Sequence, residues 1–305
     1  MTYLYYKAIN WDETEDEFDA VIWEQLTNNF WLDIRVPITE DQAAWQQLDA
    51  ATQTKIGRAL ASASLFAAYQ SERCAPALRA CRRTQQEEAV LNIATFMASV
   101  HTKGYTTIFR GLGEDERAHD FFAWADNDTA MQAAITRLDT AITSDAPTMR
   151  QAAFILIETE LLYAKIAPVL AVTNLPNVAR MLTNILAGSL IFVNYIGYKW
   201  RQNLATLSEA EQTAAKTAIL ALEQALAADE RTWLAELDPS AAEAAIELGI
   251  NHANALFDLP LIEQVATPLE ELVQTTLKRV LTQAPQEQLV DVDASEAMQE
   301  SDYDF

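Results

Sequence analysis

Residues 84–109 read TQQEEAVLNIATFMASVHTKGYTTIF, a proline-free run with apolar side chains on most of the circumference of a helix. Residues 52–73, 148–172 and 177–202 are similarly long and apolar. Helices that are apolar nearly all round belong at the centre of a bundle, because only burial removes such a surface from water. The sequence therefore predicts four long central helices.

Shorter, amphipathic stretches flank these four and should pack around them. They are residues 15–28, a short helix from about residue 39 with Thr39-Glu40-Asp41-Gln42 as a capping box, and residues 113–124, 129–143, 208–237 and 239–257. Pro147, Pro176 and Pro239 fall at predicted helix starts, where proline is tolerated, whereas Pro168 should kink a helix near its end. With only seven glycines and nine prolines in 305 residues, the composition indicates an all-α protein.

Residues 1–283 are expected to form one helical domain, followed by an acidic, disordered tail at 284–305. The net charge of −23 argues against binding to nucleic acid or to a membrane surface. The most apolar run, residues 185–193, is too short to span a bilayer and should be buried. Cys74 and Cys81 form no disulfide framework, and no secretory signal opens the chain, so a cytoplasmic location is expected.

Several spaced blocks between about residues 8 and 198, and the last four residues, carry a family resemblance. They are Asn29-Phe30-Trp31-Leu32 with Val36-Pro37, Glu87-Glu88-Ala89-Val90-Leu91, Phe96-Met97 with Val100-His101 and Tyr105, Tyr195-Ile196-Gly197-Tyr198-Lys199, and Asp302-Tyr303-Asp304-Phe305. The sequence resembles the small, radical-bearing beta subunit of class I ribonucleotide reductase, in its manganese/iron-type bacterial branch. The resemblance implies a ferritin-like helical bundle and a homodimer that works with a large catalytic alpha subunit.

The family binds two metal ions with Asp on the first long helix, Glu-x-x-His on the second, Glu on the third and Glu-x-x-His on the fourth. The corresponding positions of this chain are Ala67, Ala98, His101, Glu158, Ser189 and Phe192. Only His101 and Glu158 can ligate a metal, too few for two ions that each need roughly four to six ligands. We therefore expect no metal cofactor, and a core in which Glu158 bonds His101, Ser189 or a trapped water, or is protonated.

Tyr105 occupies the place of the family's radical tyrosine, one helical turn after His101. A buried tyrosine with a purely structural role is the alternative. A metal-free subgroup of these subunits hydroxylates this tyrosine to a catechol-type side chain, with an oxidant supplied by a flavodoxin-like activase. The resemblance to that subgroup is incomplete, because it places a lysine near the lost ligands and none occupies the four vacated positions here.

The family exports its radical through a Trp, a ligand His and an Asp that precedes the fourth-helix Glu. Trp31 and His101 are present, but the Asp position is Gly188. The family also uses a tyrosine within the tail, whereas the only tyrosine of this tail is Tyr303, where the anchor's Trp usually stands. Binding to the large subunit is assigned to Tyr303, Asp304 and Phe305.

Three functions remain open on this basis. The first is a metal-free small subunit that generates a radical at Tyr105 and passes the oxidising equivalent through Trp31 and His101. The second is a catalytically silent paralogue that binds or regulates the large subunit, which the lost ligands and Gly188 favour. The third, a ligand-binding oxidase on the same scaffold, requires metal and ranks last.

Overall fold

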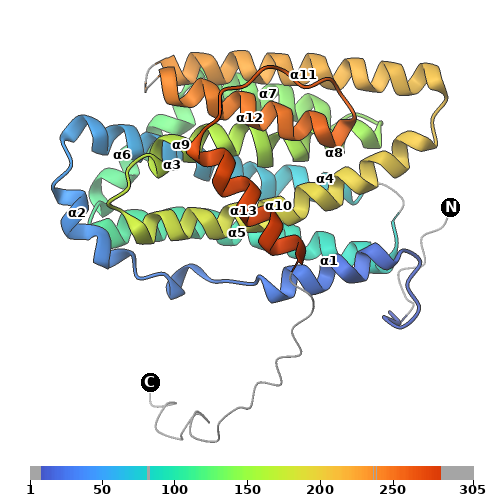
Figure 1. Cartoon of the computed structure of the whole chain (residues 1–305), viewed down its shortest axis with the longest axis horizontal. Coiled ribbons are helices and arrows are strands. Elements are labelled where there is room, and N and C mark those ends of the chain that lie inside the picture. Colours follow the sequence, from blue (N-terminus) through green and yellow to red (C-terminus); the bar gives the residue numbers. More distant parts are fainter. Residues whose placement is uncertain (1–7, 81–82, 236, 238, 283–305) are drawn as a thin grey trace, which may run out of the picture.

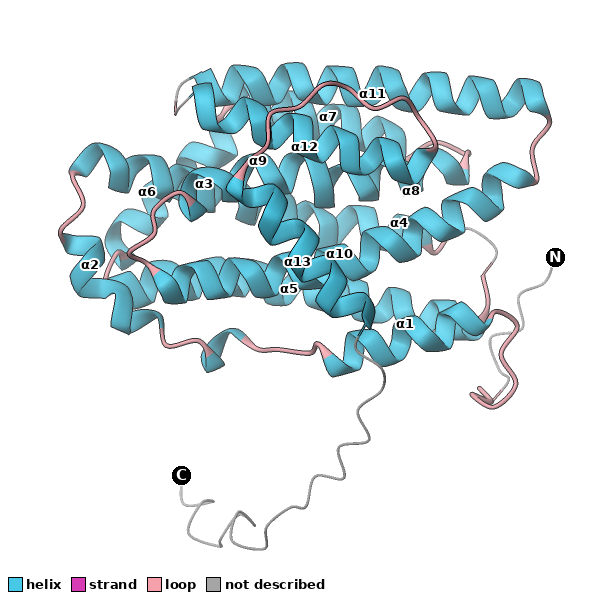
Figure 2. Cartoon of the chain, viewed as in Figure 1, coloured by secondary structure: helices cyan, strands magenta, loops and turns pink. Residues whose placement is uncertain are grey.

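The computed structural model describes residues 8–80, 83–235, 237 and 239–282, without the side chains of 239–242. Within these ranges the chain is helical and no strand occurs (Figures 1 and 2). The α-helices are α1 Glu17–Asn28, α2 Gln42–Gln46, α3 Ala50–Tyr69, α4 Ala75–Leu78, α5 Gln85–Leu112, α6 Asp115–Asn127, α7 Thr129–Ile142, α8 Pro147–Leu156, α9 Leu162–Leu170, α10 Pro176–Ala205, α11 Glu209–Ala235, α12 Pro239–Phe257 and α13 Pro268–Thr282. Short 3-10 turns occupy Asp33–Arg35 and Ile38–Asp41.

The centre of the bundle consists of α3, α5, the α8–α9 pair and α10, which are the four long helices predicted from the sequence. Helix α3 packs against α5 and α9, and α10 packs against α8. Helices α11 and α12 run side by side along one edge of the molecule, where α12 covers α9 and α11 covers α7 (Figure 1). The predicted all-α class is confirmed.

Two π-helical segments interrupt the long helices, and the sequence interpretation contained neither. Gln70–Cys74 (η3) continues α3, and Ile157–Leu161 (η4) joins α8 to α9. A π-turn holds one residue more than an α-turn, so it rotates the following side chains around the helix axis. Such segments are frequent at functional sites. Here η3 supplies Gln70 and η4 supplies Glu158 to the buried site described below.

The capping box expected at Thr39 is wrong. Thr39 lies inside a 3-10 turn that has no side-chain cap, and α2 begins only at Gln42. The Asp41 carboxylate instead accepts hydrogen bonds of 2.8 Å from the backbone N–H groups of Asn177 and Val178. It therefore caps the first turn of α10, whose free N–H groups need acceptors. The sequence motif predicted a cap for the helix that follows directly, but Asp41 caps a helix whose capped residue, Asn177, lies 136 positions further along the chain.

Helix α13 was not predicted. It crosses α10 on the face seen in Figure 1 and buries Leu269, Val273 and Val280.

Pro147 and Pro176 lie in the first turn of α8 and α10, and Pro239 begins α12, as expected. Pro168 lies inside α9, which ends two residues later.

Helix α10 is long and apolar enough to cross a membrane by length and composition alone. Within the bundle, however, 78% of its most apolar window is buried. This is the behaviour of a core helix, and residues 185–193 are buried as the sequence predicted, except for the half-buried Gly188.

Candidate active site

A small cavity of about 20 Å³ lies between the central helices. Ala67 of α3, His101 and Tyr105 of α5, Glu158 of η4 and Lys165 of α9 contribute to its lining. Ser189 of α10 joins this group through a hydrogen bond to Glu158. Ala98 and Phe192 are buried but do not line the cavity, and the Phe192 ring packs edge-on against another phenylalanine. A space of this size holds about one water molecule.

Glu158 is the central polar group of the cavity. One carboxylate oxygen accepts a 3.0 Å hydrogen bond from Gln70 Nε2, and the other accepts a bond from the Ser189 hydroxyl. Burial raises the pKa of Glu158, and the two donors act in the opposite direction. Ser189 is one of the alternative partners expected for Glu158, and Glu158 forms no hydrogen bond with His101. The sequence interpretation missed Gln70, although an amide three residues after Ala67 lies on the same helix face.

The residues present do not fit a dinuclear metal site. Glu158 and His101 are the ligand types that remain at the six positions, and both oxygens of Glu158 are already engaged. In the part of the chain that the structure describes, no cluster of three or more His, Cys, Asp or Glu side chains could hold a metal ion.

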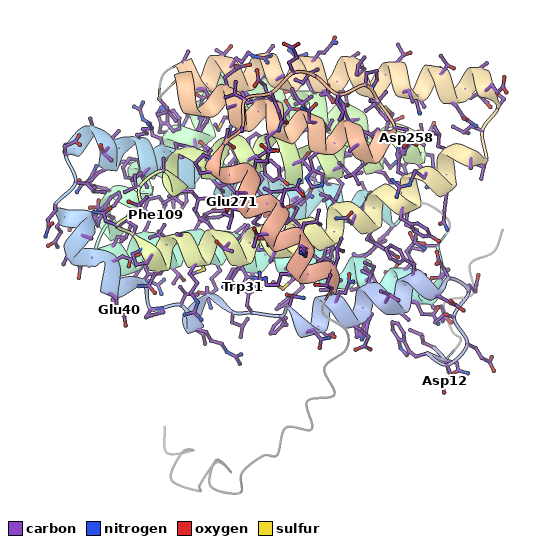
Figure 3. The ribbon with its side chains drawn as sticks, viewed as in Figure 1. Asp12, Trp31, Glu40, Phe109, Asp258 and Glu271 are labelled. Carbon is purple, nitrogen blue, oxygen red and sulfur yellow. The ribbon has the colours of Figure 1, made fainter. Side chains whose placement is uncertain are left out.

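His101 stacks on Trp31, with ring centroids 5.9 Å apart and an angle of 14° between the planes. Figure 3 shows Trp31 on the segment that runs below the bundle after α1. Among the described residues, His101 Nε2 and Trp31 Nε1 are buried without hydrogen-bond partners. Burial lowers the pKa of His101 to about 4, so its imidazole is neutral.

Gly188 explains why the His101 nitrogen has no partner. A Cβ atom placed on Gly188 would lie 3.7 Å from His101 Nε2, at ordinary contact distance. An acidic side chain at this position would therefore reach the imidazole N–H. Gly188, the position at which the family resemblance implies an Asp, therefore lies beside the imidazole that this Asp would bond.

Tyr105 is 1% exposed and lies one helical turn after His101. Burial raises the pKa of its phenol, and the charge of Glu158 raises it further. Within the described residues no protein group forms a hydrogen bond with its hydroxyl, and Tyr105 lines the cavity.

Lys165 is a cavity residue that the sequence interpretation missed. Its side chain is fully buried, forms an ion pair with Glu230 of α11, and lies 3.6 Å from the centre of the Trp233 ring. Burial lowers the pKa of Lys165, and Glu230 opposes this effect. No vacated ligand position carries a lysine, but the fold brings one to the same cavity from another part of the third long helix. A lone lysine within an apolar helix was the available signal.

The remaining predicted residues lie partly outside the structure. Tyr303, Asp304 and Phe305, like the rest of the predicted tail and Cys81, fall outside the described residues. Cys74 is a buried free thiol whose pKa is raised by burial, in agreement with the expected reduced state.

Comparison with known proteins identifies the family. The model of the ribonucleotide reductase small chain matches residues 8–251. The chain belongs to this family. The ribonucleoside-diphosphate reductase 2 subunit beta of Escherichia coli is 29% identical over 213 residues, which are 69% of this small chain and 67% of the relative. A ribonucleoside-diphosphate reductase subunit beta of Mycobacterium tuberculosis is 32% identical over 208 residues, 67% of this chain and 65% of the relative.

The dimanganese(II) NrdF structure of Streptococcus sanguinis superposes with a TM-score of 0.80 at 26% identity. The superposition covers 91% of this small chain and 100% of the other. The predicted class I beta subunit is therefore confirmed at the level of the family, and the ferritin-like bundle at the level of the fold. The two manganese ions are a property of the Streptococcus sanguinis protein.

Proposed function

We propose that this small chain is the radical-generating beta subunit of a class I ribonucleoside-diphosphate reductase that uses an oxidised Tyr105 in place of a metal centre. The observation that supports this most is a buried Tyr105 beside a small cavity whose lining has too few ligands for a dinuclear metal site. A homodimer in the cytoplasm would work with a large subunit, which would bind and reduce the ribonucleotide. The residues of the small chain then have to store one oxidising equivalent and release it.

Hydroxylation of Tyr105 would insert one oxygen atom into the ring C–H bond beside the phenol. A peroxide-level oxidant from a flavodoxin-like activase would supply this atom, and its second oxygen would leave as water. A second, one-electron oxidant from the same activase would then accept an electron from the catechol, and loss of one hydroxyl proton to water would give a neutral radical. The apolar lining excludes bulk water, which protects such a radical from reduction. Trp31, stacked on His101, is the first aromatic group on a route towards the surface.

Mass spectrometry of the intact protein and of its peptides tests this proposal. Protein co-expressed with its flavodoxin-like activase should carry one additional oxygen on Tyr105 and give a radical signal in electron paramagnetic resonance (EPR). Tyr105→Phe is the matched control, because it keeps the ring and removes the phenol. Unmodified Tyr105 together with no activity beside the cognate large subunit would contradict the proposal.

The tail is assigned to binding of the large subunit through Tyr303, Asp304 and Phe305. Deletion of these three residues should abolish the association with that subunit, as measured by sedimentation or surface-based binding. Because a terminal truncation leaves the bundle untouched, its melting temperature should stay the same. Unchanged binding would contradict this assignment.

A silent, regulatory paralogue is the second candidate, and Gly188 favours it. The unpartnered Nε2 of His101 beside this glycine interrupts the relay that the family resemblance implies. In that case Tyr105→Phe would leave the protein's effect on the large subunit unchanged, whereas deletion of residues 303–305 would remove it. Under the radical proposal both changes abolish activity, so the two variants together separate the candidates.

A further inference from the structure

A groove of about 560 Å³ lies between α10, α12, α13 and residues 261–264. Most of its lining is aliphatic, and α12, the segment that precedes α13, and α13 itself each contribute two such side chains. They are Leu248 and Leu256, Leu261 and Ile262, and Val273 and Leu277. Typical ligand pockets have volumes of roughly 300–1,000 Å³, so this groove is large enough to hold two aromatic rings.

Two asparagines of α12 hold the outer wall of the groove in place. Asn251 accepts a 2.8 Å hydrogen bond from the Ile262 N–H and donates to the Ile262 carbonyl at 3.0 Å. Asn254 donates to the Pro260 carbonyl at 3.1 Å. Leu261 is nevertheless 64% exposed and Ile262 is 42% exposed. A wall that is fixed by hydrogen bonds while its aliphatic side chains face water is typical of a binding surface.

His252 adds a hydrogen-bond donor to this lining. The hydroxyl of the fully buried Tyr163 lies 2.7 Å from His252 Nδ1. A buried hydroxyl needs an acceptor for its hydrogen, and Nδ1 is the acceptor within reach, so the N–H of the neutral imidazole is on Nε2. Glu270 is the charged residue of the lining. An occupant of this groove therefore needs apolar groups, and its carboxylates have to face away from Glu270.

The chain itself supplies such a segment directly after α13. Residues 283–305 follow this helix and lie outside the described residues. Leu277 and Val273 lie about 7 and about 14 Å from the end of α13 at Thr282, because each helical residue rises about 1.5 Å. Each residue of an extended chain spans about 3.3 Å, so the last residues can return to the groove of their own chain.

The alternation of residues 302–305 matches the groove. The sequence there is Asp302-Tyr303-Asp304-Phe305. In an extended chain successive side chains point to opposite faces, so the two aromatic rings share one face and the two carboxylates share the other. The rings can then enter the groove while the carboxylates remain in water.

We propose that Tyr303 and Phe305 occupy this groove of their own chain when the large subunit is absent. Burial of the two rings against the aliphatic lining stabilises the contact. Arg201, which donates to the carbonyl oxygen of Leu256 at 3.1 Å, places a positive charge beside the groove for the outward-facing carboxylates. Covalent attachment gives the tail a millimolar effective concentration, so weak intrinsic binding is sufficient.

The groove then competes with the large subunit for the same residues; this consequence rests on the proposed function, which assigns residues 303–305 to that subunit. Only the chains whose tail is free can bind the large subunit. If the groove holds about two-thirds of the tails, the apparent Kd for the large subunit is about threefold weaker than the intrinsic one.

Fluorine NMR of the full chain, with 4-fluorophenylalanine at position 305, tests the docking itself. A synthetic peptide of residues 294–305 with the same label gives the resonance of a free tail. The full chain should show a second, shifted resonance. Leu261→Asp should remove this resonance, whereas Val265→Asp should preserve it, because Val265 is 70% exposed in the same segment but lies outside the groove.

Three results overturn the proposal. A full chain with only the free-peptide resonance has no docked tail. A shifted resonance that survives Leu261→Asp comes from another surface. A shifted fraction that falls on tenfold dilution shows binding to the groove of a second molecule. Circular dichroism verifies the fold of each variant.

Titration with the cognate large subunit tests the competition. The shifted resonance should disappear as that subunit binds, and Leu261→Asp should lower the apparent Kd about threefold relative to Val265→Asp. Equal Kd values in the two variants contradict the competition. If the large subunit binds neither variant, the assignment of the tail in the proposed function fails, whereas docking in the groove is still decided by the NMR spectra without that subunit.

Discussion

At the scale of single residues, the buried polar side chains of the site differ in whether they have hydrogen-bond partners. Glu158 has two donors, so its burial requires no metal. His101 Nε2 and Trp31 Nε1 have none within the described chain, and each therefore carries a desolvation cost of about 1–3 kcal/mol. Unsatisfied buried donors are rare in stable cores. Gly188 lies beside His101 Nε2, so the cost at this nitrogen is connected to the acid that is missing at position 188.

Gly188→Asp should give His101 a partner. A carboxylate beside Nε2 favours the imidazolium, so the pKa of His101 should rise from about 4 by about 1 to 3 units. An NMR titration of the three histidines measures this. Gly188→Asn supplies an acceptor without charge and should produce a smaller rise. Equal values in the two variants would show that the new side chain does not reach the imidazole.

Sequence could predict the site at this scale only in part. The vacancies at Ala67, Ala98, Ser189 and Phe192 could be recognised because the surrounding blocks define their register. The bond from Gln70 to Glu158 could not, because it joins residues 88 positions apart across two helices. Which donor meets a buried carboxylate depends on how the helices are rotated, and the π-helical segment alters that rotation.

At the scale of elements, α9 and α11 are joined by the Lys165–Glu230 ion pair, both side chains of which are essentially fully buried. Burial raises the pKa of Glu230 while Lys165 opposes that rise. A buried pair adds little net stability, because desolvation offsets the attraction, but removal of one member leaves an uncompensated charge.

Lys165→Met should therefore destabilise the protein by about 3–5 kcal/mol. Lys165→Met with Glu230→Leu should restore most of this loss, because no buried charge remains from the pair. Urea unfolding of the wild type, both single variants and the double variant gives the coupling free energy. If the losses of the single variants simply add in the double variant, the two side chains are not energetically coupled.

The four central helices also allow the assignment of the vacated positions to be tested together. Ala67→Asp, Ala98→Glu, Ser189→Glu and Phe192→His in one protein restore the ligand types that the family uses. The metal-free form should be less stable than the wild type, because it buries acids that repel one another. Manganese or iron should bind in stoichiometric amounts and raise the melting temperature.

Elemental analysis after dialysis measures the bound metal of this fourfold variant. The same variant with Glu158→Gln is its control and should retain less metal. If the fourfold variant retains none, these positions are not equivalent to the family's ligands.

At the scale of the whole molecule, buried titratable groups should make stability depend on pH. Burial raises the pKa of Glu223 on α11 to about 7, against an ordinary 4.5. Between these values the folded protein holds a proton that the unfolded chain has lost. The contribution of Glu223 to stability therefore falls as pH rises through this window, by an amount on the order of 3 kcal/mol.

Glu223→Gln should remove this dependence. The free energy of unfolding of this variant minus that of the wild type should be larger at about pH 8 than at about pH 5. Urea titrations at the two pH values measure the difference, and the contributions of His101 and His252 cancel because both proteins contain them. Glu209→Gln, an exposed change on the same helix, should leave the difference flat. A flat difference for Glu223→Gln would contradict the assigned pKa.

The sequence by itself determined the class of fold and the long central helices, because these follow from local composition and apolar periodicity. It also predicts the loss of the family's metal ligands, from the identity of the residues at the corresponding positions. Helix α13 was missed although its sequence carries local signals, which are Pro268 at its start, an apolar face with Leu269, Val273 and Val280, and the Thr267 hydroxyl that accepts a hydrogen bond from the Glu270 N–H. Only the tertiary structure decided the polar pairs: Gln70 with Glu158, Lys165 with Glu230, and Tyr163 with His252. Each pair joins two different helical segments, and its formation depends on their relative rotation and register, which no short stretch of sequence encodes.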